Sequence, residues 1–468
     1  MKTTAAVAVL LALSPARATE VTVYNSNLGL IKQTREFDLK AGVGELRVDD
    51  VAANIDPTSV HFKSLPDPDA VRVLEQDFRY DLASPEAVLN RYLGREVTLE
   101  REVGRDGGKT ESITGVLLSN SGGRVIESGG RILIDPPGHP VLKALPEGLT
   151  TKPTLVWTVE AKRGGRQKGE ISYLTAGLSW SADYVLVVDK TDSRADLTAW
   201  TTIVNNSGAT YKDARLKLVA GDVHRAPTPL TRRFALAMGA MAKTGGPAMQ
   251  EQPFFEYHIY TPARRTTLAD NSSKQVEMAS AQGVAVKKLF VYDGAGGQSW
   301  YGGDAGNWDP DYGTEGNKKV GVYFEFKNSA ASGLGIALPK GRVRVYKADG
   351  DGSLQLAGED SIDHTPKDET VRVKMGDAFD VVGERKRVDY SSDTKRRRFE
   401  ESFEIRVRNH KDASVDVAVI ERLYRWSGWK IVKASSKWIK KDAQTVEFPV
   451  TVPKDGEAVV DYTVRYDW

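Results

Sequence analysis

The sequence contains no cysteine among its 468 residues. This absence excludes a disulfide framework, a thiol nucleophile, cysteine-ligated zinc or iron–sulfur sites, and lipid attachment at an N-terminal cysteine. Because no covalent crosslink can hold the chain together, its folded state must depend on packed cores. We expect roughly three or four such cores, given the usual domain length.

The sequence is also poor in histidine and lacks the short motifs of common catalytic sites. Its six histidines are not at metal-ligand spacing, and there is no H-E-x-x-H motif. The stretch Gly177–Ser181 lacks the second glycine of a nucleophile elbow. Neither a phosphate-binding loop nor a dinucleotide fingerprint occurs. We therefore predict no metal, no cofactor and no catalytic residue of these kinds.

Neither sign of charge dominates the composition. Lysine and arginine together number 65 and aspartate and glutamate 63, so the formal net charge is +2. Such a balance argues against nucleic-acid binding by charge alone. The charged fraction of 27% indicates a well-solvated surface. Beyond the N-terminus no apolar run is long enough for a transmembrane helix.

Residues 1–18 are predicted to be a signal peptide. Lys2 supplies the positive start, residues 5–13 form an apolar run too short to span a bilayer, and residues 16–18 match an A-x-A cleavage site. The mature chain would then begin near Thr19 and be periplasmic or secreted. A buried N-terminal helix is the alternative interpretation.

Strand patterns dominate the rest of the chain, which predicts an all-β fold of tandem immunoglobulin-like β-sandwich domains with a small SH3-like barrel insert. One helix interrupts them, with Ser84 as N-cap, Pro85 at its first position and Gly94 at its end. The predicted parts are an N-terminal sandwich part at 19–93 with the short helix, the barrel insert at 94–140, a central sandwich at 141–290, a β-rich segment at 291–377 and a C-terminal immunoglobulin-like sandwich at 378–468.

Two insertions and a hairpin interrupt this strand pattern. Residues 225–252 are rich in proline and glycine and are predicted to be a long mobile loop. A second glycine-rich insertion covers 294–316. Residues 341–359 are predicted to be a hairpin whose turn is Asp349–Gly352.

A strand that ends in asparagine before a small polar turn occurs three times. The three copies are TTIVNNSGA from residue 201, YFEFKNSAAS from residue 323 and EIRVRNHKDAS from residue 404. Asparagine tolerates the left-handed conformation that such turns need. The repetition is typical of tandem sandwiches.

The stretch from Glu170 to Asp222 reads as four strands joined by tight turns, with Trp180, Tyr184 and Trp200 at its centre. On extended strands, side chains four residues apart can face one core, where large aromatics fill the space between two sheets. We therefore predict a packing role for the Trp180–Tyr184 pair.

The same stretch carries a family resemblance that covers most of the mature chain. YLTAGLSWSADYVLVVD resembles the Y-x-x-x-x-x-SW-x-x-x-Y strand pair of the mucoidy-inhibitor-A-like bacterial envelope proteins, which contain the domain of unknown function 4139. NNSGATYKDARLKL is similar to a second motif of that family, with Tyr211 where relatives usually carry tryptophan. The long coiled-coil arm of some relatives is absent. The resemblance implies an envelope protein without an agreed activity and supplies no catalytic residues.

Residues 298–317 contain the most suggestive pattern for a ligand, because aromatic and acidic residues alternate there. Aromatic faces and carboxylates that accept hydroxyl hydrogen bonds suit a glycan. Calcium, or simple docking of the aromatics on the sheets, is the alternative, although the spacing does not fit an EF-hand loop. The candidate ligand-binding residues are Trp300, Tyr301, Asp304, Trp308, Asp309, Asp311 and Tyr312.

Two basic stretches, Glu384–Arg387 and Lys395–Arg398, are predicted to lie on a hairpin with solvated, salt-bridged faces. Contact with an anionic glycan or a lipid surface is the alternative. For the whole protein we predict non-enzymatic binding or scaffolding of a cell-envelope glycan or protein. The alternatives are a cofactor-free hydrolase of envelope polymer that uses carboxylates of the 304–311 region, and an outer-membrane-associated β protein.

Overall fold

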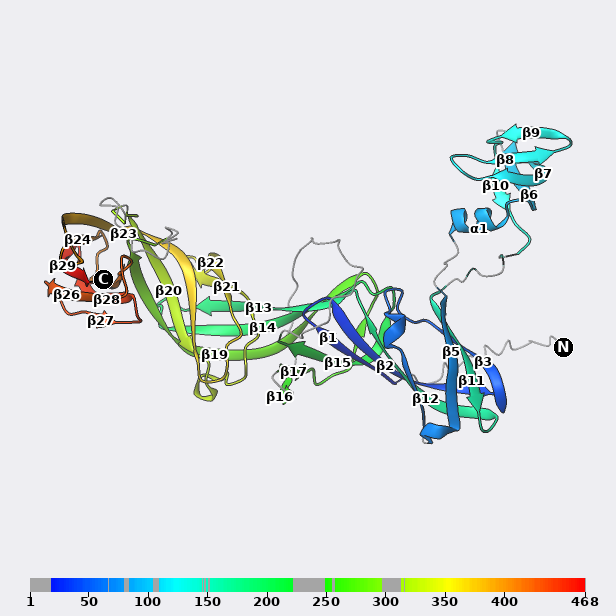
Figure 1. Ribbon diagram of the computed structural model, residues 1–468, viewed down its shortest axis with the longest axis horizontal. Helices are drawn as coiled ribbons and strands as arrows, with labels where there is room; N and C mark the ends of the chain where they lie inside the picture. The colour runs from blue at the N-terminus through cyan, green and yellow to red at the C-terminus, as the bar shows by residue number, and fades with distance from the viewer. Residues whose placement is uncertain are drawn as a thin grey trace, which may run out of the picture. The chain divides into compact units, whose positions relative to one another are not determined.

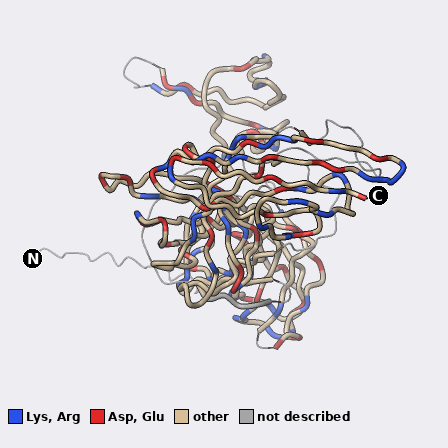
Figure 2. Tube along the Cα trace, turned by 90° about the vertical axis from the view of Figure 1, so that its left-hand side faces the viewer, with Lys and Arg blue, Asp and Glu red and all other residues tan. Residues whose placement is uncertain are grey.

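The computed structural model describes residues 18–467 apart from 66, 80–83, 104–108, 145, 147–148, 150–151, 222–248, 255–256, 297–312 and 315. Most of the described residues are in strands and few are in helices, which confirms the predicted all-β, sandwich-like fold (Figure 1). Basic and acidic residues are interspersed along the chain (Figure 2). The described residues divide into two compact units, one mainly of residues 18–180, 203–221 and 257–274, the other mainly of 181–202 and 275–467.

The first unit is built around one large sheet. Its hydrogen-bonded order is β16-β17-β15-β1-β2-β12-β4, with β18 paired to β15, and a separate sheet has the order β3-β11-β5. Buried residues alternate with more exposed ones along β2 and β12, and Val21, Val23 and Ile31 have no exposed surface. The strands are β1 (Ala18–Tyr24), β2 (Leu28–Leu39), β3 (Gly42–Asp49), β4 (His61–Leu65), β5 (Val71–Arg79), β11 (Thr154–Ala161), β12 (Gly165–Thr175), β15 (Tyr211–Ala220), β16 (Gln250–Phe254), β17 (Tyr257–Thr261) and β18 (Thr266–Leu268).

Between β5 and β11 the chain forms the predicted helix and five short strands. Helix α1 (Pro85–Arg91) begins as predicted, because the Ser84 hydroxyl accepts a hydrogen bond from the Ala87 N–H at 3.1 Å. The strands follow the order β10-β6-β7-β8-β9 around a small apolar core. They are β6 (Glu96–Val103), β7 (Lys109–Ser119), β8 (Val125–Ser128), β9 (Arg131–Ile134) and β10 (His139–Val141).

The Trp180–Tyr184 pair packs inside the protein as predicted, but its two members serve different units. Both lie on β13 (Leu178–Val188), and each is at most 5% exposed. The Trp180 indole donates to the Val219 carbonyl at 3.1 Å within the first unit, and the Tyr184 hydroxyl donates to the Pro339 carbonyl at 2.7 Å within the second. These aromatics therefore explain the fold rather than a ligand site.

The second unit contains a long, curled sheet whose order is β22-β21-β13-β14-β19-β20-β23-β24-β29-β26, with β25 paired to β19 and β28, and β27 to β28. The predicted hairpin is present as β21 and β22. The strands are β14 (Arg194–Asn205), β19 (Ser272–Asp293), β20 (Lys319–Lys327), β21 (Gly341–Ala348), β22 (Leu354–Ile362), β23 (Thr370–Asp393), β24 (Arg398–Asn409), β25 (Val415–Arg422), β26 (Trp429–Ala434), β27 (Ile439–Lys440), β28 (Thr445–Val452) and β29 (Gly456–Asp467).

The C-terminal part of this unit, residues 378–467, packs around a dense core, and it is called the C-terminal sandwich below. Strand β28 lies against β24 and β29 across this core. The ring of Tyr462 is 5.3 Å from the rings of both Phe403 and Phe448, centroid to centroid. Burial of each such side chain contributes about 1.5–3 kcal/mol. Three single-turn 3-10 helices complete the described elements, at Pro57–Ser59, Pro68–Ala70 and Ala330–Ser332. Among the described residues no helix has the length and apolar character needed to cross a membrane.

Buried asparagines close the three repeated turns, but not for the predicted reason. Asn205, Asn328 and Asn409 all lack a positive φ, and each is at most 1% exposed. Their side-chain amides instead donate to backbone carbonyls of two separate loops. The acceptors are Ala209 and Ala269 for Asn205, Ile336 and Pro366 for Asn328, and Ala413 and Pro453 for Asn409, all at 2.7–3.0 Å. Each buried asparagine thus has its own amide satisfied and links two loops through one side chain.

Candidate functional site

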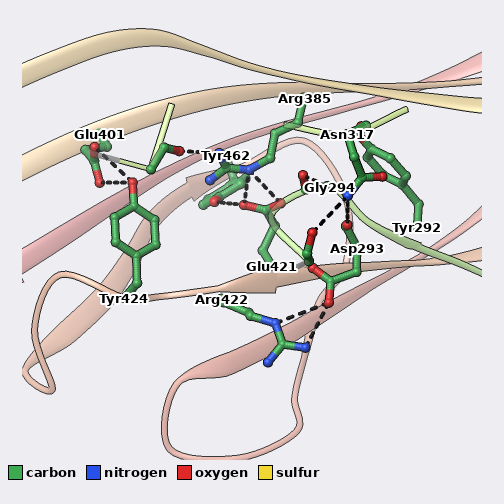
Figure 3. A network of polar contacts seen from close by, with 12 residues as sticks. Tyr292, Asp293, Gly294, Asn317, Arg385, Glu401, Glu421, Arg422, Tyr424 and Tyr462 are labelled. Atoms are coloured by element: carbon green, nitrogen blue, oxygen red, sulfur yellow. Dashed lines mark hydrogen bonds and ion pairs between the residues drawn. The ribbon is translucent and has the colours of Figure 1, made fainter. Parts of the chain in front are cut away.

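The C-terminal sandwich contains an ion pair that is fully removed from solvent. Arg385 on β23 and Glu421 on β25 both have no exposed side-chain surface. The Arg385 Nε donates to the two Glu421 carboxylate oxygens at 2.9 and 3.0 Å. The Tyr462 hydroxyl on β29 donates to the same carboxylate, so that three strands converge on Glu421 (Figure 3).

A second buried ion pair lies beside the first. The Arg425 Nη2 donates to the Glu401 Oε1 at 2.9 Å, and neither side chain has exposed surface. Arg387 approaches the same carboxylate at 3.3 Å, and the Tyr424 hydroxyl donates to it at 3.4 Å (Figure 3). The Arg425 guanidinium also lies 5.1 Å from the centroid of the Tyr390 ring, a favourable cation–π distance. The two pairs with their tyrosines are called the ionic cluster below.

Strand alternation explains why Arg385 points inward. Residues 381, 383 and 385 share one face of β23, and all three are buried. A side chain at Gly383 would place its Cβ 2.1 Å from the Tyr292 ring, so glycine is needed for the ring to pack there. The basic stretch Glu384–Arg387 was predicted to be a solvated face, and this prediction is wrong for the buried Arg385. Glu384 and Lys386 on the opposite face fit that prediction: Glu384 pairs with Arg408 at 2.9 Å, and Lys386 is exposed.

The other basic stretch, Lys395–Arg398, does lie on an exposed hairpin turn between β23 and β24. Arg396 pairs with Asp393 at 3.6 Å, and Arg398 pairs with Asp467 at 2.9 Å. This prediction of a solvated, salt-bridged face is confirmed. The two basic stretches have similar compositions. They differ only in how their basic residues are placed relative to the apolar residues that alternate along the strand.

The ionic cluster and neighbouring polar side chains hold the residues that flank segment 297–312. On the far side of that segment, the Arg385 Nη1 donates to the Gly313 carbonyl at 2.7 Å. On the near side, Arg422 donates to the Asp293 carboxylate at 2.8 Å. The Asn317 amide joins the two sides, because it donates to the Asp293 carbonyl at 2.8 Å (Figure 3). The Tyr292 hydroxyl donates to the Asn317 carbonyl at 2.7 Å. The two ends of the segment are thereby tied together.

Burial controls the electrostatics of the first ion pair. It raises the pKa of Glu421 above its ordinary value, although Arg385 and the Tyr462 hydroxyl oppose the shift. Burial also opposes the charge on Arg385, but Glu421 together with Tyr462 and Tyr424 outweighs it, so that the pKa of the guanidinium is raised. The pKa of Glu421 is therefore higher in the folded state than in the unfolded state. Its contribution to stability is complete at pH values below the unfolded-state pKa, and it is lost as the pH rises through the folded-state pKa.

The ionic cluster is built as a framework and not as a catalytic pair. Glycoside hydrolysis needs two carboxyl groups that face a substrate across roughly 5–10 Å. Glu401 and Glu421 are instead both inaccessible, and each is bonded to an arginine. In the part of the chain that the structure describes, no group of three or more histidine and acidic side chains is arranged to hold a metal ion.

All seven candidate ligand residues predicted between Trp300 and Tyr312 lie outside the described residues, as does most of the predicted loop 225–252 and all of the predicted signal peptide except Ala18. Gln250, predicted to be in that loop, instead begins β16. The ionic cluster was not predicted. The sequence feature that could have predicted it is the placement of Arg385, Glu401 and Glu421 at core-facing positions of strands with alternating apolar residues.

Sequence reasoning also missed residues 429–441, here called the Trp–Lys segment. Its sequence, WKIVKASSKWIKK, contains five lysines and no acidic residue. It begins as β26, at one end of the sheet order, and reaches β27, which pairs with β28. Residues 431–434 and 436–438 line a shallow depression of about 560 Å³. The sequence feature that could have revealed this segment is the regular alternation of lysine with tryptophan and isoleucine.

The fold and the two features above define an all-β sandwich protein with a buried ionic framework and a basic, aromatic surface segment. The chain belongs to the family described as "Domain of unknown function (DUF4139)", which matches residues 170–468, more than half of the chain. The match includes the whole ionic cluster and the Trp–Lys segment. No curated protein matches the chain.

Proposed function

We propose that this protein is a non-enzymatic binding or scaffolding protein of the bacterial cell envelope, and that its ligand is a glycan bound by residues 297–312. One observation carries the proposal: Arg385 of the ionic cluster holds Gly313 on one side of this segment, while Arg422 and Asn317 hold Asp293 on the other.

The energetics of the ionic cluster support a positioning role. A buried ion pair is weak evidence for stability, because desolvation of two charges offsets their attraction. Apolar residues of similar volume would serve the core at least as well. What the charges add is direction: Arg385 has a fixed fork of donors, and one of them ends on the Gly313 carbonyl.

Rigid ends favour binding by the segment between them. A scaffold that fixes the residues on both sides of a binding segment before the ligand arrives lowers the free-energy cost of binding. The aromatic residues Trp300 and Trp308 would stack on sugar rings, while Asp304, Asp309 and Asp311 would accept hydrogen bonds from sugar hydroxyls.

The envelope location rests on the N-terminal pattern and on the resemblance to mucoidy-inhibitor-A-like proteins. Lys2, the apolar run 5–13 and the A-x-A site at 16–18 fit an exported chain. A periplasmic or secreted protein without cysteine is consistent with stability from packed cores alone.

The test is binding of the mature chain to peptidoglycan and to purified envelope polysaccharides. The variant Trp300→Ala with Trp308→Ala should lower the affinity at least about tenfold, because each lost stacking contact removes an aromatic anchor. Trp438→Ala is the matched control, since it removes an exposed tryptophan elsewhere. Equal binding by all three proteins, or no binding by the parent, would contradict the proposal. Release of reducing ends during incubation would indicate a hydrolase instead.

A further inference from the structure

The Trp–Lys segment carries a concentrated positive charge. Its five lysines fall within thirteen residues that include no acid. Only Lys441 has a carboxylate partner among the described residues, Glu447 at 3.1 Å. The other four, Lys430, Lys433, Lys437 and Lys440, are exposed. This differs from the rest of the described surface, where lysine and arginine commonly pair with aspartate or glutamate across the strands.

Apolar side chains are exposed among these lysines. Val432 and Trp438 are each 38% exposed and Ile439 is 50% exposed. They lie beside or within the shallow depression lined by residues 431–434 and 436–438. Exposed apolar groups ringed by charges of one sign are typical of a surface that meets a partner.

The segment is held in place before any partner arrives. The Trp429 indole donates to the Ala443 carbonyl at 2.7 Å. The Trp438 ring meets the Trp429 ring edge-on with centroids 6.3 Å apart, and the Lys440 Nζ lies 4.8 Å from the Trp429 centroid. Lys441 is fixed by its ion pair, so both ends of the segment are braced.

We propose that the Trp–Lys segment binds the surface of an anionic lipid bilayer. The lysines would contact lipid phosphates, with their alkyl chains along the apolar surface and their ammonium groups at the headgroups. Trp438, Ile439 and Val432 would enter the interface between headgroups and acyl chains, where tryptophan is favoured. The Trp–Lys segment does not overlap residues 297–312 in the sequence, so the inference goes beyond the glycan-binding function.

The apolar residues favour a membrane over a soluble acidic polymer. A polyanion in water would use the lysines but has no need of exposed valine and isoleucine side chains. A sugar would need an open aromatic face, whereas the Trp429 ring already receives Lys440 and the edge of Trp438. A bilayer uses both kinds of group at once.

The test is co-sedimentation of the full mature chain with vesicles of phosphatidylcholine alone or mixed with an equal part of phosphatidylglycerol. We expect binding to the mixed vesicles only, with weakening at high salt because the Debye length shortens. Lys433→Glu with Lys437→Glu should reduce binding at least about tenfold. Lys367→Glu with Lys454→Glu, two exposed lysines without carboxylate partners among the described residues, is the matched control and should bind like the parent.

A second variant separates a membrane from an acidic polymer. Trp438→Ser with Ile439→Ser keeps every lysine and should still lose most vesicle binding. Undiminished binding by this variant, equal binding of the parent to neutral vesicles, or no vesicle binding by the parent would overturn the proposal. The Trp300→Ala, Trp308→Ala variant should bind vesicles like the parent, which distinguishes failure of this inference from failure of glycan binding. Circular dichroism and thermal unfolding would verify that each variant is folded.

Discussion

Two arginines of the C-terminal sandwich, Arg385 and Arg425, have no exposed side-chain surface, and each is paired with a glutamate that is equally buried. A core position is a costly place for a charge unless its partner is present with good geometry. At the scale of residues, the molecule therefore depends on pairs: neither member of a pair is tolerable alone. Arg385 has a further role, because its second donor reaches the Gly313 carbonyl.

Arg385→Met should lower the free energy of unfolding by about 3–5 kcal/mol at neutral pH, because it leaves Glu421 buried without its counter-charge. The loss should shrink as the pH falls, since the isolated carboxyl, whose folded-state pKa is already raised by burial, takes up a proton. Denaturant unfolding followed by tryptophan fluorescence over a pH series measures both effects.

Arg406→Met is the matched control for this prediction. Arg406 makes exposed ion pairs with Glu404 at 2.9 Å and Glu457 at 3.2 Å. Surface pairs of this kind contribute about 0–1 kcal/mol. Equal losses for the two variants, or a loss for Arg385→Met that does not depend on pH, would contradict the role given to the buried pair.

At the scale of elements, buried asparagines join the turns of the sandwiches to neighbouring loops. Asn409 donates to the Ala413 carbonyl at 2.8 Å and to the Pro453 carbonyl at 2.9 Å, and Asn205 and Asn328 do the same in their own turns. Asn317 makes a similar connection at the base of segment 297–312. A two-loop connection through one amide fixes where the next strand begins.

Asn409→Gly should destabilise the protein about as much as Asn409→Ala, by about 1–3 kcal/mol, because both variants remove the hydrogen bonds of the buried amide that link the two loops. If asparagine were needed at position 409 because it tolerates a left-handed backbone conformation, Asn409→Gly would be as stable as the parent. Asn271 offers the control, since it is exposed and has a φ of 50°. Asn271→Gly should change the unfolding free energy little, and thermal unfolding of the three variants decides between the two explanations.

Gly313 is the point at which the ionic cluster meets the end of segment 297–312. Its φ is +74°, and a Cβ there would lie 2.2 Å from the Tyr424 ring. Gly313→Ala should therefore displace this end, cost about 1–2 kcal/mol in backbone strain alone, and weaken glycan binding. Gly350→Ala, whose Cβ would meet nothing within 4 Å, is the control. Binding and stability of Gly313→Ala equal to those of the control would contradict the anchoring role.

At the scale of the whole molecule, the chain is held by packed cores without any covalent crosslink. No cysteine is present, and the balanced charge gives no strong overall field. The local excess at the Trp–Lys segment is hidden in that balance, because five lysines in thirteen residues barely alter a total of 65 basic and 63 acidic residues. The total charge of the chain therefore gives no guide to function, which must be sought in local sequence patterns.

The sequence predicted the β architecture well, because alternation of apolar residues, glycine at turns and the Ser84-Pro85 helix start are local signals. It predicted burial of Trp180 and Tyr184 for the same reason. It did not predict the ionic cluster, since the pairing of Arg385 with Glu421 joins strands that are far apart in the sequence. Composition made Glu384–Arg387 look like Lys395–Arg398, and only the register of β23 separates a buried stretch from an exposed one.

The most direct test of the proposed binding function is an equilibrium titration of the mature chain with solubilised peptidoglycan and envelope polysaccharides, with product analysis in the same samples. We predict saturable binding by the parent and the same affinity for Trp438→Ala. The variant Trp300→Ala with Trp308→Ala should bind with an affinity at least about tenfold lower. We also predict no change in the length of the polymer. Cleavage of the polymer, or binding that is indifferent to the two tryptophans, would contradict a non-enzymatic protein that binds glycan through residues 297–312.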